Sequence, residues 1–276
     1  AYPTHIVGHR ALVHVSPRTE TGVEQLASID WAAVLPFVAV GFVAQMVDGA
    51  LSMAFGVIAS TLMVSALGVV PARASAAVHL VEVFTTAASG LSHLWQRNVD
   101  WRLFVRLVGP GIAGGVVGAY LLSISGDPAR PFVMAYLAAI GLYLLLRAFR
   151  PQPEPREPRF VGPLALAGGF LDAAGGGGWG PVVTSNLLVQ GANPRMTIGT
   201  VIAAEFFLTT AISATFILTL GWQAFTLATM GVLIGGVAAA PFGAILVRQV
   251  RPRLLLGVVG VVLTLTSAWS IYRALA

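Results

Sequence analysis

Cysteine and lysine are both absent from this chain, and charged residues of any kind are scarce. Without cysteine there can be no disulfide, no thiolate metal site and no thiol chemistry. Only 10% of the residues are charged, whereas a typical soluble domain carries about 25%. Hydrophobic residues make up 57% of the chain. Because lipid does not solvate charge, this composition predicts that most of the chain lies in a bilayer.

Sequence motifs for enzymatic chemistry are also absent. The chain has no nucleotide-binding loop, no zinc-type histidine cluster and no serine-nucleophile motif. ATP-driven transport within this chain is therefore unsupported, and we expect a protein that is not an enzyme and that binds no cofactor or metal. No basic face or stripe stands out from the loops, so nucleic-acid binding is not expected either.

Apolar stretches long enough to form helices in lipid recur along the chain. They cover residues 31–47, 50–70, 72–95, 102–123 and 130–149, and then 161–174, 177–190, 195–220, 222–247 and 254–275. Residues 1–30 are polar and mixed, which predicts an exposed tail. Residues 150–160 are rich in proline and charge, which do not fit a helix interior in lipid. We therefore divide the chain into a tail, a first repeat over 31–149, a linker over 150–160 and a second repeat over 161–276.

The two apolar halves share features at nearly constant spacing. Asp48 and Asp172 are 124 residues apart, and each precedes a run of glycine or small residues. Glu82 and Glu205 are 123 residues apart, each inside the next long segment. The other matched pairs are Phe55-Gly56 with Trp179-Gly180, Pro71 with Pro194, Trp101 with Trp222, and Gly118-Ala119 with Gly243-Ala244. Duplicated halves are a common construction of secondary transporters.

Length excludes a single straight helix for the first two segments of each half. A helix over 31–67 would be about 55 Å long, against a hydrocarbon core of about 30 Å. Each pair is better interpreted as a broken hairpin, with the aspartate and the small residues at its turn. Three crossing segments then remain in each half, and an odd number inverts the second half. The predicted fold is an all-α polytopic membrane protein with two inverted-topology repeats, each a broken helical hairpin plus three transmembrane helices.

The distribution of arginine agrees with inversion. Under this topology 11 arginines lie on one side of the membrane and 5 on the other. The arginine-rich loop at 248–253 has a nearly neutral counterpart at 123–130, as inverted copies require. The positive-inside rule then makes the linker cytoplasmic and puts both termini outside.

Four acids lie in apolar surroundings, namely Asp48, Glu82, Asp172 and Glu205. A carboxylate at the bilayer centre costs roughly 2.5–3.5 kcal/mol on insertion scales, so it usually faces a cavity or a partner. We assign these acids to coupling or gating. For the two aspartates an alternative stays open, in which each caps the helix that follows its break.

Two further polar residues join this coupling or gating group. His79 lies three residues before Glu82 on the same helical face. It can tune that acid or share its proton, and structural packing is the alternative. Gln45 lies one turn before Asp48.

A dense glycine run in the second half predicts a substrate site. Glycine lets backbone approach a ligand closely, and the N-terminus of the following helix favours an anion. The matching stretch of the first half has fewer glycines but adds a hydroxyl donor. The candidate substrate-binding residues are Gly175, Gly176, Gly177, Gly178 and Trp179, with Ser52, Met53 and Phe55 from the first half. The alternative for such small residues is tight helix packing, to which we assign Gly114-Gly115, Gly168-Gly169 and Gly235-Gly236.

The duplicated pattern of apolar helix, glycine-rich break, short helix and proline-led helix resembles the TauE/SafE family of sulfite exporters, also called toluenesulfonate uptake permeases. The second half carries the resemblance at 168–181 and 193–200, and the first half departs from it at Leu51-Ser52-Met53-Ala54. The resemblance covers about residues 31–275. It implies transport of sulfite or a related sulfur oxyanion across the bacterial cytoplasmic membrane.

Two inverted halves predict alternating access, with a small sulfur oxyanion bound where the breaks meet. Free N–H groups of Gly176, Gly177 and Gly178, with the Ser52 hydroxyl, would hold its oxygens. A carboxylate repels an anion unless it is protonated, which predicts proton coupling and, with the family, export. The expected partners are this anion and the bilayer, while an oligomer is compatible with the sequence but not predicted by it. The rivals are a cation or metal transporter that uses the four acids and a non-transport membrane subunit.

Overall fold

The computed structural model describes residues 31–53, 55–66, 71–125, 130–149, 156–221, 227–249 and 251–275. The predicted tail, most of the predicted linker and Trp222 lie outside these residues. By its internal contacts the chain divides into residues 1–33 and residues 34–276. The packing below is that of the second unit.

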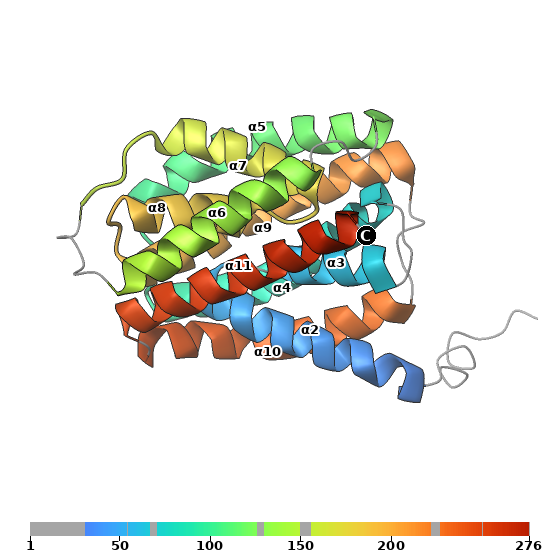
Figure 1. Cartoon of the computed structure of the whole chain (residues 1–276), viewed down its shortest axis with the longest axis horizontal. Coiled ribbons are helices and arrows are strands. Elements are labelled where there is room, and N and C mark those ends of the chain that lie inside the picture. Colours follow the sequence, from blue (N-terminus) through green and yellow to red (C-terminus); the bar gives the residue numbers. More distant parts are fainter. Residues whose placement is uncertain are drawn as a thin grey trace, which may run out of the picture. The chain divides into compact units, whose positions relative to one another are not determined.

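All regular structure in the described residues is helical, without a strand among them (Figure 1). The first half contains α2 (Trp31–Leu51), α3 (Phe55–Ala66), α4 (Pro71–Trp95), α5 (Trp101–Ser125) and α6 (Arg130–Ala148). The second half contains α7 (Val161–Gly175), the π-helix η1 (Gly180–Thr184), α8 (Ser185–Val189), α9 (Pro194–Leu220), α10 (Leu227–Gln249) and α11 (Pro252–Leu275). The predicted all-helical fold is confirmed, and each predicted apolar segment coincides with a helix or with the η1–α8 pair.

Local sequence explains where the long helices begin. Pro194 is the first residue of α9, where its missing N–H is not needed. The side chain of the preceding Asn193 accepts a hydrogen bond from the Met196 amide at 3.3 Å. Asp100 caps α5 in the same way, because its Oδ1 accepts the amides of Arg102 at 2.9 Å and Leu103 at 3.2 Å. These caps satisfy N–H groups that a helix N-terminus leaves free.

Helices that the predicted repeat pairs with each other make corresponding contacts. The long helices α4 and α9 pack on each other, as do α6 and α11 (Figure 1). Helix α5 packs on α9, and its predicted counterpart α10 packs on α4. The core therefore lies along α4 and α9.

Paired glycines bring neighbouring helices into backbone contact, as the packing assignment predicts. A Cβ on Gly114 of α5 would lie 2.0 Å from the Leu166 carbonyl oxygen of α7. A Cβ on Gly235 of α10 would lie 1.9 Å from the Val38 carbonyl oxygen of α2. The α5–α7 and α10–α2 pairs thus use the same device of small residues, which is common between helices in membranes.

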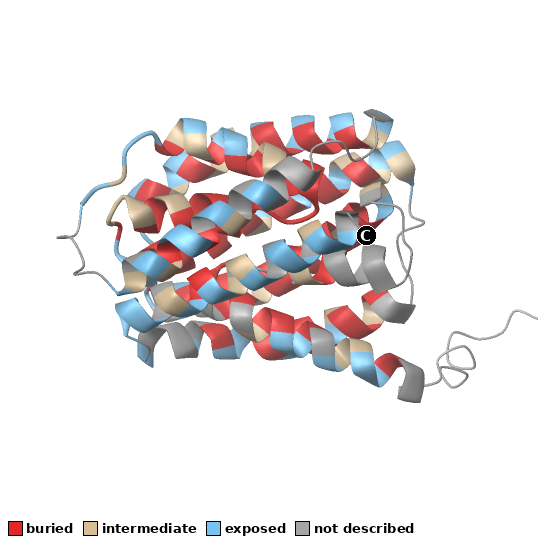
Figure 2. Ribbon diagram, in the orientation of Figure 1, coloured by how far each residue is buried: buried red, intermediate tan, exposed pale blue. Residues whose placement is uncertain are grey.

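The surface of these helices is suited to lipid. Helices α4, α5 and α9 are each long and apolar enough to cross a membrane, over Ala72–Trp95, Trp101–Ile124 and Pro194–Leu220. Figure 2 shows exposed residues along α6 and α11, and many of them are apolar, such as Leu146, Leu265 and Tyr272. Extended apolar surface of this kind marks contact with a membrane rather than with water.

The glycine packing yields a test within one helix. Gly114→Ala should lower the free energy of unfolding by about 1–3 kcal/mol, the usual cost of overpacking, because its methyl group meets the backbone of α7. Gly109 lies on the same helix with open space around its Cβ position, so Gly109→Ala is the matched control and should be neutral or stabilising. Unfolding of the purified protein in detergent measures both. Equal losses in the two variants would contradict the packing.

Candidate functional site

The backbone leaves helical geometry at two equivalent places. Ser52, directly after α2, has φ of 54°, which is uncommon for a residue with a side chain. Gly176 and Gly177, directly after α7, have φ of 70° and 134°. The next segment then begins with η1, which is a π-helix. This form is rare in proteins overall, and where it occurs it is often found at functional sites. We call Ser52–Met53 with the start of α3 the first break, and Gly176–Trp179 with the start of η1 the second break.

The two breaks touch each other through their backbones. A Cβ on Gly56 would lie 2.7 Å from Cα of Gly177, and a Cβ on Gly180 would lie 3.0 Å from Cα of Met53. The repeat predicted from the sequence pairs Gly56 with Gly180 and Met53 with Gly177, each 124 residues apart, and under that pairing these contacts are reciprocal. The Thr184 hydroxyl also donates to the Ser52 carbonyl at 3.3 Å. The structure therefore brings the predicted substrate-binding backbones together.

The N–H groups of the second break are not free, which corrects the sequence-based mechanism. The Asp172 carboxylate accepts the amides of Gly178 at 2.6 Å and Trp179 at 2.7 Å through its Oδ1 atom. The Asp172 carbonyl accepts the amides of Gly176 and Gly177. The sequence left this capping open, as the alternative to a role in coupling or gating. The capping alternative thus describes Asp172.

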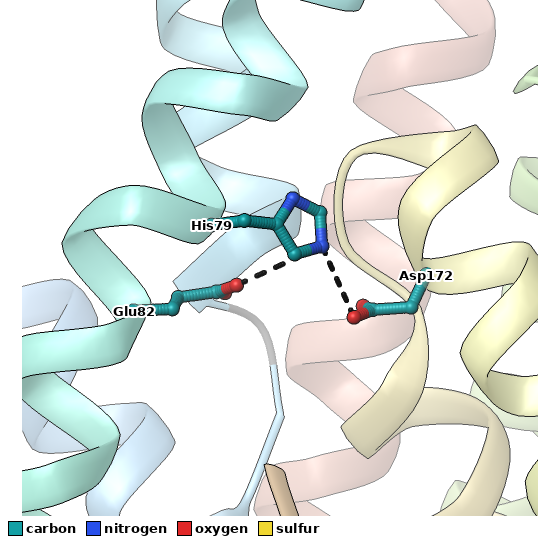
Figure 3. A group of neighbouring side chains, drawn as sticks. All are labelled: His79, Glu82 and Asp172. Carbon is teal, nitrogen blue, oxygen red and sulfur yellow. Dashed lines mark hydrogen bonds and ion pairs between the residues drawn. The ribbon is translucent and has the colours of Figure 1, made fainter. Parts of the chain in front are cut away.

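His79 connects the two halves through Asp172. Figure 3 shows His79 and Glu82 projecting from α4 toward Asp172 on α7. The His79 Nε2 atom lies 3.1 Å from Asp172 Oδ2 and 4.0 Å from Glu82 Oε2. The Ser75 hydroxyl, one turn earlier, donates to the Ala173 carbonyl at 3.0 Å. The contacts of His79 with Asp172 and of Ser75 with Ala173 join residues more than 90 positions apart in the sequence.

The hydrogen bonds of His79 fix where its protons lie. Its Nδ1 atom is 2.7 Å from the Ser75 carbonyl oxygen, which only accepts, so Nδ1 carries a proton. The contact between Nε2 and Asp172 Oδ2 needs one more proton, on either the imidazole or the carboxyl group. Asp172 Oδ1 already accepts two N–H bonds, which stabilise the ionised carboxylate. The geometry therefore favours an imidazolium–carboxylate pair that shares one proton.

Several buried polar atoms around this pair have no hydrogen-bond partner among the described residues. From the candidate group these are both side-chain heteroatoms of Gln45, the Ser52 hydroxyl, and one carboxyl oxygen each of Glu82 and Glu205. All four acids of the candidate group, Asp48, Glu82, Asp172 and Glu205, are buried. An unpaired buried polar group costs about 1–3 kcal/mol. Such a concentration is expected where a ligand or a proton is handled.

The two aromatic candidates, Trp179 and Phe55, are buried between packed helices. Trp179 is fully buried, its ring would meet a Cβ on Gly111 at 2.7 Å, and its Nε1 donates to the Val201 carbonyl at 3.2 Å. Phe55 is also buried and lies close to Gly236. Gly175 closes α7, and Met53 is buried within the first break.

Some polar residues of this region escaped the sequence analysis. Ser89 and Ser213 are buried, and their hydroxyls have no hydrogen-bond partner in the described part of the chain. A repeat signal for others was present. Thr86 and Thr209 are 123 residues apart, four residues after Glu82 and Glu205, and each threonine donates to the carbonyl of its glutamate. Aligning the two halves residue by residue would have found this pair.

The chain is similar to known proteins of one membrane-transporter family. The family described as sulfite exporter TauE/SafE matches residues 37–270. A relative in Bacillus subtilis (strain 168), described as "Probable membrane transporter protein YtnM", is 41% identical over 245 residues, which cover 85% of this chain and 81% of the relative. No solved structure matches the chain significantly.

The Asp172 contacts predict different outcomes for two substitutions. Asp172→Ala leaves two buried N–H groups without their acceptor, so stability should fall by about 2 kcal/mol or more. Asp172→Asn keeps an oxygen for both amides, and its Nδ2 can donate to a neutral His79 at Nε2, so it should stay near the wild-type value. Thermal unfolding in detergent compares them. If Asp172→Ala is as stable as the wild type, Asp172 does not hold the break.

Proposed function

The chain belongs to the TauE/SafE sulfite exporter family, and from this we propose that it moves sulfite or a related sulfur oxyanion out of the cell as a proton-coupled secondary transporter. Family membership and the B. subtilis relative support membrane transport. The family description supports a sulfur oxyanion as the cargo. The chemistry of the breaks supports an anion independently.

The observation on which the proposal depends is that the Asp172 carboxylate binds the backbone amides of the second break. It accepts two adjacent backbone N–H groups at 2.6 and 2.7 Å at the start of η1. Such paired donors suit the oxygens of any small oxyanion. We interpret Asp172 as an internal anion that occupies the donors until the substrate replaces it. Gly178 and Trp179 then supply the amides for the substrate, where the sequence predicted those of Gly176, Gly177 and Gly178.

The proton shared with His79 provides a way to release these donors. Transfer of the proton from His79 Nε2 to Asp172 Oδ2 converts the imidazolium to neutral imidazole and the carboxylate to a neutral carboxylic acid. Hydrogen bonds to a neutral acceptor are roughly half as strong as those to an ionised one. The hold of Asp172 on the two amides is then weakened, and an oxyanion can take its place.

The unpartnered groups supply the remaining contacts. The Ser52 hydroxyl and the Gln45 amide are buried donors without a partner among the described residues, so they can bind substrate oxygens. Glu82 and Glu205 would repel an anion when ionised, and so we assign them to proton coupling. The substrate brings negative charge and the protons bring positive charge. Binding of one therefore favours binding of the other.

Alternating access between inverted halves explains how such a site opens. In this structure the breaks are packed backbone to backbone, so the substrate enters only when the halves move apart. The reciprocal contacts of Gly56 with Gly177 and of Gly180 with Met53 support a two-fold relation between the halves. We propose that the relation is an inversion, with the linker in the cytoplasm and both termini outside.

A divalent cation is the second candidate cargo. One ligand atom from each of His79, Glu82 and Asp172 lies within 4.8 Å of the others, a spacing that suits a metal ion. The two N–H donors that face Asp172 have no role in cation binding, and therefore we place this candidate second.

Carboxamide variants test the assignment of the glutamates. Glu82→Gln and Glu205→Gln should each abolish the pH dependence of sulfite flux, since the amide cannot carry a proton. Flux into liposomes, measured across imposed pH gradients, gives the readout. Glu24→Gln, in the predicted tail, is the matched control and should behave as the wild type. Unchanged flux in both variants would remove these acids from the mechanism.

A thermal shift screen separates the two cargoes. A ligand that binds only the folded protein stabilises it in proportion to the logarithm of its concentration over its Kd. We expect sulfite or sulfonates to raise the melting temperature, and Asp172→Asn to alter that response. A shift with Mn²⁺ or Zn²⁺ and none with sulfite would favour the cation instead.

A further inference from the structure

A basic groove lies away from the breaks, where the segment before α7 crosses the start of α5. It has a volume of about 930 Å³. Its lining residues come from α5, from the segment at 156–160 and from the end of α8, namely Arg106, Arg156, Glu157, Pro158, Arg159, Phe160 and Gln190. Nothing in the transport mechanism above uses these residues.

Hydrogen bonds fix the backbone that forms this groove. The amide of Arg159 donates to the Gln190 side-chain oxygen at 2.7 Å, and the amide of Arg156 donates to the Gly191 carbonyl at 3.2 Å. The Arg106 guanidinium donates to the Pro158 carbonyl at 3.3 Å. Hydrogen bonds therefore fix the segment both to α5 and to the end of α8. The backbone that forms the groove is thus held in place.

The charge in the groove is positive. Its acidic residue, Glu157, pairs with Arg102 at 3.6 Å, which removes it as a partner for the lining arginines. The side chains of Arg156 and Arg159 are exposed and have no ion-pair partner within the residues that the structure describes. An anion is therefore the complementary ligand.

The surroundings point to an amphiphile rather than a free ion. Phe160 is 79% exposed, and its φ of 53° directs the chain into α7, which begins at the next residue. Trp101, at the first residue of α5, is 60% exposed. Exposed aromatic rings beside arginine at the ends of membrane helices are typical of the headgroup level. The groove is also much larger than a three-oxygen anion requires.

We propose that this groove binds the phosphate headgroup of an anionic phospholipid. Arg156 and Arg159 contact the phosphate, and Arg106 adds positive charge while it holds Pro158. Phe160 packs against the glycerol and the upper acyl chain. Basic pockets next to membrane helices bind anionic headgroups in this way. The lipid would then stabilise the packing of the segment at 156–160 against α5.

Native mass spectrometry of the full chain in detergent tests the site, with phosphatidylglycerol and phosphatidylcholine as probes. We expect wild type to retain phosphatidylglycerol in preference, and Arg156→Gln/Arg159→Gln to bind it about tenfold or more weakly, since each basic residue near a headgroup contributes measurably. Arg251→Gln/Arg253→Gln removes the same charge at other exposed positions and should bind as the wild type. Arg156→Lys/Arg159→Lys should recover most of the binding.

Three results would overturn the proposal. Equal loss in the two Gln double variants would mean that net charge alone attracts the lipid. Equal binding of phosphatidylcholine and phosphatidylglycerol would exclude headgroup recognition. Binding of sulfite or glycerol phosphate as tight as that of phosphatidylglycerol, lost in Arg156→Gln/Arg159→Gln, would make the groove a site for free anions.

Discussion

The buried carboxylate of Asp172 is the group on which the site depends. A charge in this environment must be paired, and Asp172 is paired from two sides. Two backbone amides of its own break bind one oxygen, and His79 of the other half binds the second. The shape of the second break and its contact with α4 therefore follow from one side chain. The glycines that follow Asp172 allow the chain to turn back on the carboxylate, because they adopt left-handed φ without strain.

This arrangement also explains why the site combines strain with unsatisfied groups. Ser52 is held at a left-handed φ, and Gln45, Glu82 and Glu205 have buried atoms without a hydrogen-bond partner in the described structure. Each feature raises the free energy of this closed arrangement. A transporter needs such a balance, because two arrangements must differ by only a few kcal/mol for a ligand to shift one into the other. The close backbone packing of α5 on α7 at Gly114 would keep these two helices together as a rigid unit while the two breaks move apart.

The helices and the central acids could be predicted from the sequence because their signals are local or periodic. Hydropathy predicts the helical segments. The spacings of 124 and 123 residues pair Asp48 with Asp172 and Glu82 with Glu205 in the sequence alone. For the amides of the second break the sequence left two alternatives, a free anion site and a helix cap, since the outcome depends on how the Asp172 side chain folds back. The contact of His79 with Asp172 was equally hidden, because His79 has Ile202 as its counterpart in the second half and so carries no repeat signal.

A crystal structure grown with sulfite is the most direct test of the internal-anion mechanism. The account predicts sulfite oxygens on the amides of Gly178 and Trp179, with the Asp172 carboxyl group turned away toward His79. It also predicts that the two breaks are no longer in backbone contact. Sulfite bound elsewhere, with Asp172 still accepting both amides, would contradict the account.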